Sequence, residues 1–266
     1  MALGFLKRMF GSGEAPAPAA PPPAAELDPR AAVNAARAAA RAIRRDHQPF
    51  EWAEARQLLA NALLNLAAEQ PGDAACSTYE DAESVLAEAI EVAGPDAHPA
   101  FLASMINLHG YAAYRRGEQL DGAAKRRACA DAAERFTTAL AKITPETHHT
   151  LWVDLGFYRG AAYQSLALLA DGAEAAACLD EAAASFRAVA ARGTTDGSVH
   201  PIAAYNLHVV LQNRAGVTPG RDALPYLTES RHALVQAMDG PTFAATKPDH
   251  EARLAALDAA ISAARG

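Results

Sequence analysis

From residue 30 onward, the apolar positions of the chain fall in long alanine-rich segments that are separated by prolines. Ten of the sixteen prolines lie in this part of the chain, and none of them interrupts one of the segments. Because proline ends helices, the pattern predicts a series of helices of roughly 15 to 22 residues. Valine, isoleucine and threonine show no alternation long enough to predict a strand.

Three sequence signals predict where individual helices begin. Asp28 followed by Pro29 is typical of an N-cap and a first-turn proline. The run Thr144-Pro145-Glu146 predicts a second helix start of the same kind. Thr78 and Asp81 have the spacing of a capping box before a third helix.

The alanine-rich segments repeat with a period of about 50 residues. The positions that align are Trp52, Leu102 and Trp152; Ala60, Gly110 and Gly160; and Leu86, Phe136 and Phe186. Each unit reads as a helical hairpin in which a small residue allows two helices to approach closely and a large residue fills the space beside them. One hairpin cannot bury its apolar faces alone, so the repeat predicts a stack.

The expected domain covers residues 30–266. It holds four hairpins, near 50–94, 100–143, 150–193 and 201–239, with a leading helix over 30–46 and a closing helix over 249–265. The predicted fold is an all-α solenoid of about four helical hairpins with flanking helices.

The third unit resembles the tetratricopeptide repeat in a long-period form. The resemblance rests on Trp152, Gly160, Ala162 and Tyr163, with Phe186 in the following helix, and it extends over about residues 50–238. The chain departs from the family in its period, which is usually about 34 residues. The first unit also has Ala60 and Leu63 where the third has Gly160 and Tyr163. The resemblance implies a curved, non-catalytic scaffold that binds partner proteins on a concave face.

If the resemblance holds, the first helix of each unit lines that inner surface. The side chains expected in a partner-binding groove are Gln57, Asn61, Asn107, Tyr111, Tyr114, Arg115, Asp154, Phe157 and Gln164. Amide, aromatic and arginine side chains suit recognition of a peptide or helix. The alternative is that Tyr111 and Tyr114 only pack between repeats.

Residues 1–10 form a short apolar and basic peptide. Placed on a helix, its residues give an apolar side with nearby positive charge, and those expected to act as an anchor are Leu3, Phe5, Leu6, Lys7, Arg8, Met9 and Phe10. Such a peptide could lie in an anionic lipid interface, dock into a groove of another protein, or be a tail or a helix on the protein's own body. Residues 11–29 contain six prolines among small residues and are typical of a tether.

A basic segment follows the tether. Residues 30–45 contain five arginines and no acidic residue, and Arg30, Arg37, Arg41 and Arg44 are spaced to share one helical face. This face could bind an anionic membrane or an acidic partner. It could equally be the solvated face of a capping helix, or its arginines could pair with the acidic remainder of the chain.

Composition and motifs narrow the function classes. The net charge of −7 disfavours general nucleic-acid binding, and no apolar run approaches a membrane span. The three cysteines form no CxxC pair, and the adjacent His148 and His149 lack the spacing of a metal motif. We therefore expect no metal, no cofactor and no catalytic site.

The function expected from these patterns is that of an adaptor with a protein partner of unknown identity. Its expected place is the cytoplasm, with residues 1–10 holding it to the inner face of a membrane or to an assembly. The alternative is a free cytoplasmic adaptor or chaperone whose N-terminal peptide docks into another protein. Self-association through an exposed end of the stack is a further possibility, and it would give a homo-oligomer.

Overall fold

The computed structural model describes residues 28–194, 198–239 and 241–265. These residues form ten α-helices and two short 3₁₀ helices, with no strand among them. The α-helices are α2 (Pro29–Ala42), α3 (Pro49–Ala68), α4 (Gly72–Ala93), α5 (Pro99–Glu118), α6 (Gly122–Leu140), α7 (His149–Ala167), α8 (Gly172–Arg192), α9 (Pro201–Gly216), α10 (Leu224–Met238) and α11 (Lys247–Arg265). The 3₁₀ helices are η1 (Gly220–Ala223) and η2 (Pro241–Thr246).

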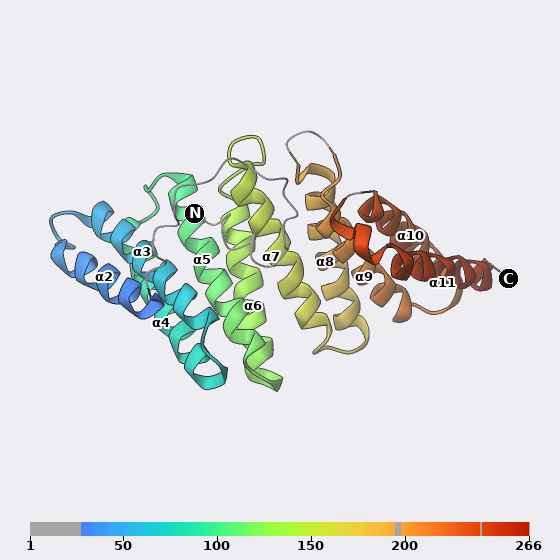
Figure 1. Ribbon diagram of the computed structural model, residues 1–266, viewed down its shortest axis with the longest axis horizontal. Helices are drawn as coiled ribbons and strands as arrows, with labels where there is room; N and C mark the ends of the chain where they lie inside the picture. The colour runs from blue at the N-terminus through green and yellow to red at the C-terminus, as the bar shows by residue number, and fades with distance from the viewer. Residues whose placement is uncertain (1–27, 195–197, 240, 266) are drawn as a thin grey trace.

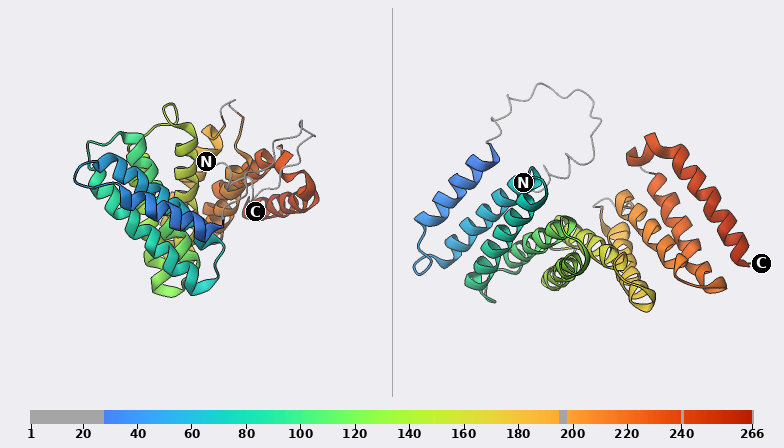
Figure 2. Two further views of the ribbon diagram at one scale, coloured as in Figure 1. Left: turned by 60° about the vertical axis from the view of Figure 1, so that its left-hand side comes forward. Right: turned by 90° about the horizontal axis from the view of Figure 1, so that it is seen from below.

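The helices pack in chain order. Four antiparallel hairpins, α3–α4, α5–α6, α7–α8 and α9–α10, follow one another, with α2 against α3 at one end and α11 against α10 at the other. Figure 1 shows this single row, and the second view of Figure 2 shows that the row is curved. The prediction of an all-α solenoid of four hairpins with flanking helices is confirmed.

The first helices of the hairpins lie closer together than the second helices do. The backbones of α3 and α5 and those of α5 and α7 approach each other, whereas the backbones of α4, α6 and α8 stay farther apart and are bridged by long side chains. A stack bends toward its more closely spaced side. We therefore place α3, α5 and α7 on the inside of the curve, and we call them the first-helix row.

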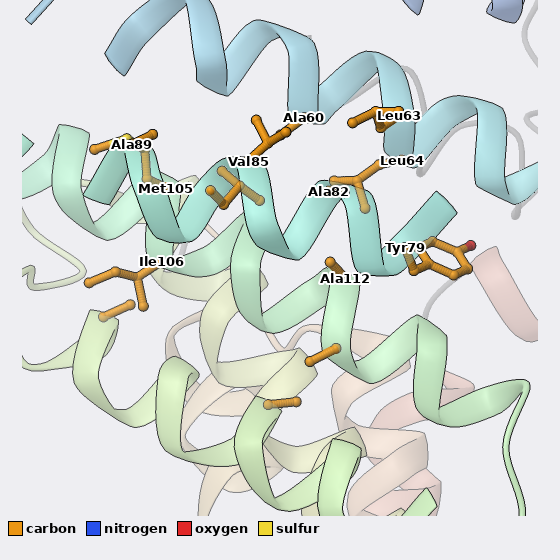
Figure 3. Packing of buried hydrophobic residues seen from close by; sticks show 14 of the residues in the cluster. Ala60, Leu63, Leu64, Tyr79, Ala82, Val85, Ala89, Met105, Ile106 and Ala112 are labelled. Carbon is orange, nitrogen blue, oxygen red and sulfur yellow. The ribbon is translucent and has the colours of Figure 1, made fainter. Parts of the chain in front are cut away.

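Small side chains allow the helices of a hairpin to approach each other. Figure 3 shows Ala60 and Leu63 of α3 above Ala82 and Val85 of α4, and all four are buried. Alanine at these crossings brings the two backbones close together, and the larger side chains fill the gaps beside them. The core is therefore a series of similar helix–helix interfaces along the stack.

A glycine begins the second helix of three hairpins. Gly72, Gly122 and Gly172 have φ of +50°, +53° and +53° and are the first residues of α4, α6 and α8. Residues with a Cβ rarely adopt this left-handed conformation, so glycine permits the tight turn between the paired helices. These glycines share the 50-residue period.

The predicted start of α2 is confirmed, because the Asp28 carboxylate accepts a hydrogen bond from the backbone N–H of Arg30 at 3.1 Å and Pro29 is the first helical residue. The end differs from the expected 30–46. Ile43 is extended, with φ −98° and ψ 129°, so the helix stops at Ala42.

The helix start predicted at Thr144-Pro145-Glu146 is wrong. α7 begins at His149, and residues 144–148 form a separate turn. The Thr147 hydroxyl donates to the Thr144 carbonyl oxygen at 3.1 Å, and the backbone N–H of His148 donates to the same oxygen at 3.0 Å. The side chain that was expected to cap a helix therefore belongs to a turn that closes on itself.

The capping box predicted at Thr78 and Asp81 is also wrong, because both residues lie inside α4. The Thr78 hydroxyl bonds the Ala74 carbonyl oxygen of the preceding turn at 2.9 Å and Gln70 Oε1 at 2.6 Å. The helix instead starts six residues earlier at Gly72, where the positive-φ turn ends.

Candidate partner-binding face

The first-helix row carries the residues that were predicted to form a groove. Gln57 of α3 donates a hydrogen bond from Nε2 to Ser104 Oγ of α5 at 2.9 Å, so this predicted groove residue bridges two units. Asn61 and Gln164 are half-buried, and their side chains make no hydrogen bond within the described part of the chain. All three lie on first helices, as expected.

Three tyrosines form an aromatic cluster at the centre of the row. Tyr158 of α7 lies edge-on to Tyr111 of α5, with ring centroids 5.0 Å apart, and its ring centroid is 6.2 Å from that of Tyr114. Burial raises the pKa of Tyr111 and of Tyr114 to about 12 and raises that of Tyr158 further. The phenols are therefore neutral at physiological pH, and the cluster is an apolar surface with hydroxyl groups.

Sequence reasoning missed Tyr158 and chose Phe157 in its place. Phe157 packs against Phe186 of α8 with ring centroids 5.6 Å apart, and Tyr158 contacts the neighbouring unit. The equivalent positions in the first two units are Leu58 and Leu108. Leu108 is half-buried against the core but Leu58 is exposed, so an apolar residue at this position did not by itself signal a contact with another unit.

Arg115 is held by its own chain. Its Nη1 donates to the Tyr111 hydroxyl at 2.8 Å, and its Nε lies 2.7 Å from Glu118 Oε2. Its guanidinium carbon is 5.9 Å from the ring centroid of Tyr79 and 5.7 Å from that of Tyr111. These contacts favour a packing role for Tyr111, one of the two tyrosines for which the sequence left that alternative open, and they hold Arg115 in place as well.

Asp154 differs from the other residues of the row. Burial raises the pKa of its carboxyl to about 6, and no hydrogen bond or ion pair within the described residues offsets that cost. On α5, the buried Asn107 Oδ1 also lacks a hydrogen-bond partner. In the 50-residue register, Asn107 and Asp154 occupy the positions of Gln57 and Ser104, which are bonded to each other one unit earlier. Polar groups with unmet hydrogen bonds are costly when buried and are characteristic of ligand sites.

The basic helix α2 presents three arginines, and not four. Arg30, Arg37 and Arg41 are exposed on α2, whereas Val33 and Ala40 are buried against α3. Arg44 lies beyond the helix end and pairs with Asp46 at 2.7 Å, so its assignment to the helical face was wrong. The N-terminal peptide, residues 1–10, and the tether up to residue 27 lie outside the described residues.

Two other kinds of site, a metal site and a membrane-spanning helix, are absent among residues 28–194, 198–239 and 241–265. Within these ranges no three His, Cys, Asp or Glu side chains are placed to hold a metal ion, and no helix is long and apolar enough to cross a bilayer. His149 Nε2 instead lies 2.9 Å from the Arg192 carbonyl oxygen.

Comparisons of this chain with protein-family models, with curated proteins and with solved structures give no match.

Proposed function

We propose that this chain is a non-catalytic adaptor that binds a segment of a partner protein along the first-helix row. The observation that carries the proposal is Asp154, a half-buried carboxyl on the first-helix row that bonds to no described side chain and whose pKa partial burial raises to about 6. A partner that supplies hydrogen-bond donors or a cation at this position would remove that cost. Asn107 Oδ1 offers a second acceptor one unit away.

The surroundings of Asp154 suit a peptide ligand. Tyr111 and Tyr158 pack on each other but are only half-buried, so they leave some rigid aromatic surface within reach of a partner, and aromatic side chains dominate the energetics of protein interfaces. Asn61 and Gln164, farther along the row, have free amide groups that can read a partner backbone. Recognition would therefore combine a central charged contact with flanking amide contacts.

Residues 1–10 would give the adaptor a second attachment. Their apolar and cationic side chains suit the surface of an anionic membrane, and the proline-rich tether would let the solenoid reach a partner while it stays anchored. Two linked attachments raise the effective concentration of the complex at the surface. In the alternative, the same peptide docks into another protein, and the adaptor or chaperone is free in the cytoplasm.

Site-specific photocrosslinking tests the partner-binding proposal. A photoreactive phenylalanine analogue would be placed at Asn61 or at Gln164 of the full chain, expressed in the cells that naturally produce it. Matched controls would carry the analogue at Ala87 of α4 or Arg127 of α6, which are exposed on second helices. We expect the same protein adduct from both first-helix positions and none from the controls. Adducts at the controls alone, or none at any of the four positions, would overturn the proposal.

A further inference from the structure

A groove runs between α2 and α4 across α3, at the N-terminal end of the stack. It consists of two adjoining cavities of about 400 and 260 Å³, and Arg37, Leu63 and Asp81 line both of them. Leu63 is buried, as are Leu59 and Val85, which line the larger cavity. These three side chains are therefore covered, and the apolar surface that the groove leaves accessible comes from half-buried residues, Ile43 in the larger cavity and Leu66 in the smaller one.

One wall of the groove is positively charged. Arg30 and Arg37 line the smaller cavity, and Arg37 and Arg41 line the larger one. Their side chains are exposed, and their guanidinium groups make no hydrogen bond or ion pair within the described chain. From Arg30 to Arg41 the helix rises about 16 Å, so the three charges follow roughly three helical turns.

The other gaps between successive second helices are closed by ion pairs. They are Arg135–Glu83 between α6 and α4 at 2.8 Å, Arg126–Glu174 between α6 and α8, Arg187–Glu229 between α8 and α10 at 2.7 Å, and Arg231–Asp258 between α10 and the closing helix α11 at 2.6 Å. α2 takes the place of a second helix ahead of α4. In this gap the arginines of α2 have no carboxylate partner within the described chain, although Asp81 lines the same cavities and Arg56, which lines the larger one, pairs with Glu88.

The charge of the surroundings selects the kind of occupant. Residues 30–45 carry five arginines and no acidic residue, while the whole chain has a net charge of −7. An acidic segment would thus be repelled by most of the molecule and attracted to α2. The chain's own residues 1–10 carry Lys7 and Arg8, so they have the same sign as the arginine wall.

We propose that the groove between α2 and α4 is a docking site for an acidic amphipathic helix of a partner protein. Apolar side chains of that helix would rest on the half-buried Ile43 and Leu66, and its carboxylates would pair with Arg30, Arg37 and Arg41. The site lies at the end of the stack and uses none of the residues around Asp154. It therefore stands whether or not the first-helix row binds a partner.

The proposal is tested with a designed peptide of about 14 residues. Leucines would recur every three or four residues to form one apolar face, with glutamates beside them and a fluorophore at one end. A control peptide would carry glutamine in place of every glutamate. Binding to the full chain would be measured by fluorescence anisotropy at about 50 mM and about 300 mM salt.

Two variants separate charge from shape. The charge variant combines Arg30→Gln, Arg37→Gln and Arg41→Gln, and its matched control combines Arg127→Gln, Lys142→Gln and Lys247→Gln, which are exposed cations elsewhere. The shape variant is Ser84→Trp, at an exposed serine that lines the larger cavity, and its control is Ala87→Trp, which is exposed on α4 outside the cavity lining. Circular dichroism would verify the folded state of each variant.

We expect the charge variant to bind the acidic peptide about tenfold or more weakly and its control to bind it unchanged. Ser84→Trp should also weaken binding while Ala87→Trp does not, and added salt should weaken binding to the wild type. Equal binding of the glutamate and glutamine peptides would overturn the proposal, as would equal binding by the charge variant and its control. A third outcome would also overturn it: the acidic peptide does not bind, but the protein binds vesicles of phosphatidylglycerol and needs the three arginines to do so. The surface would then recognise lipid.

Discussion

Gly110 of α5 lies directly against the ring of Phe136 in α6: a Cβ at Gly110 would sit 2.9 Å from Phe136 Cε1. The same relationship recurs one unit later, where a Cβ at Gly160 would lie 2.9 Å from Phe186. In the first unit the equivalent pair is Ala60 and Leu86, so a larger residue on one helix accompanies a smaller one on the other. At each hairpin crossing the two facing side chains therefore fill a similar total volume, which is divided differently between the two helices.

Gly110→Ala should therefore overpack the crossing and lower the free energy of unfolding by about 1 to 3 kcal/mol. Adding Phe136→Leu, which reproduces the pair of the first unit, should restore part of that loss, because the smaller side chain makes room for the new methyl group. Chemical denaturation of the two single variants and the double variant would measure the coupling. Gly216→Ala is the matched control, since nothing lies within 4 Å of its Cβ. Strictly additive losses would contradict this account of the crossing.

Asp154→Asn should stabilise the protein in a pH-dependent way. Burial raises the folded-state pKa of Asp154 to about 6 from an ordinary value of 3.8, so the wild type loses stability as the pH rises between these values. Above pH 6 the variant should be more stable by about 1 to 2 kcal/mol, and below pH 3.8 the difference should vanish. Thermal melts across this range would measure it. A variant that is less stable than wild type at neutral pH would show that the carboxylate has a partner within its own chain.

His109→Gln should change the pH dependence in the opposite direction. Burial, helped by the charge of Arg135, lowers the pKa of His109 to about 4, so the unfolded chain takes up a proton at a higher pH than the folded protein does. The wild type should lose on the order of 2 kcal/mol from this residue as the pH falls from 6.5 to 4. Chemical denaturation at pH 6.5 and at pH 4 should show that the free energy of unfolding falls less for the variant than for the wild type. An identical loss in both proteins would mean that His109 does not contribute.

Arg115→Met should lower the melting temperature, because the change removes the hydrogen bond to Tyr111 and the ion pair with Glu118 while keeping most of the aliphatic stem. We expect the free energy of unfolding to fall by about 1 to 3 kcal/mol. Arg127→Met, at an exposed position on α6, should have little effect and serves as the control. Unchanged stability in Arg115→Met would instead make this arginine available to a partner.

Deletion of residues 2–10 tests the second attachment. If the peptide is a lipid anchor, the full chain should float with anionic liposomes and less with neutral ones, and the deleted chain should float with neither. Circular dichroism should show that the helices remain formed in the deleted chain. If neither form floats, the lipid role is wrong and the peptide is left as a protein-docking segment or a tail.

The predictable part of the fold follows from repetition. Gly110 and Phe136 recur at 50-residue steps as Gly160 and Phe186, so hairpin pairing and stack order could be read before any contact was known. The turns at Gly72 and its equivalents could also have been found, because proline or aspartate precedes each glycine.

The candidate site was harder to predict because it depends on helix rotation. Phe157 and Tyr158 are adjacent and both aromatic, and a rotation of about 100° decides which of them contacts the neighbouring unit. The contact of Arg115 with Tyr79 was equally hidden, since Tyr79 belongs to another helix and no local spacing signals it, whereas the bonds to Tyr111 and Glu118 have ordinary same-face helical spacings. Arg37 and Arg41 are unpaired because no carboxylate of the described chain lies within ion-pair distance of them. Those distances depend on how all the helices of the stack pack.

The strictly sequential packing of the helices has a mechanical consequence. Because each helix packs mainly on the helices before and after it in the chain, a force applied between α2 and α11 passes through every interface in series. Extension is then shared among many small hinges, and the weakest interface yields first while the rest remain folded. The solenoid should extend elastically under force, and its stiffness should depend on which units a bound partner holds together.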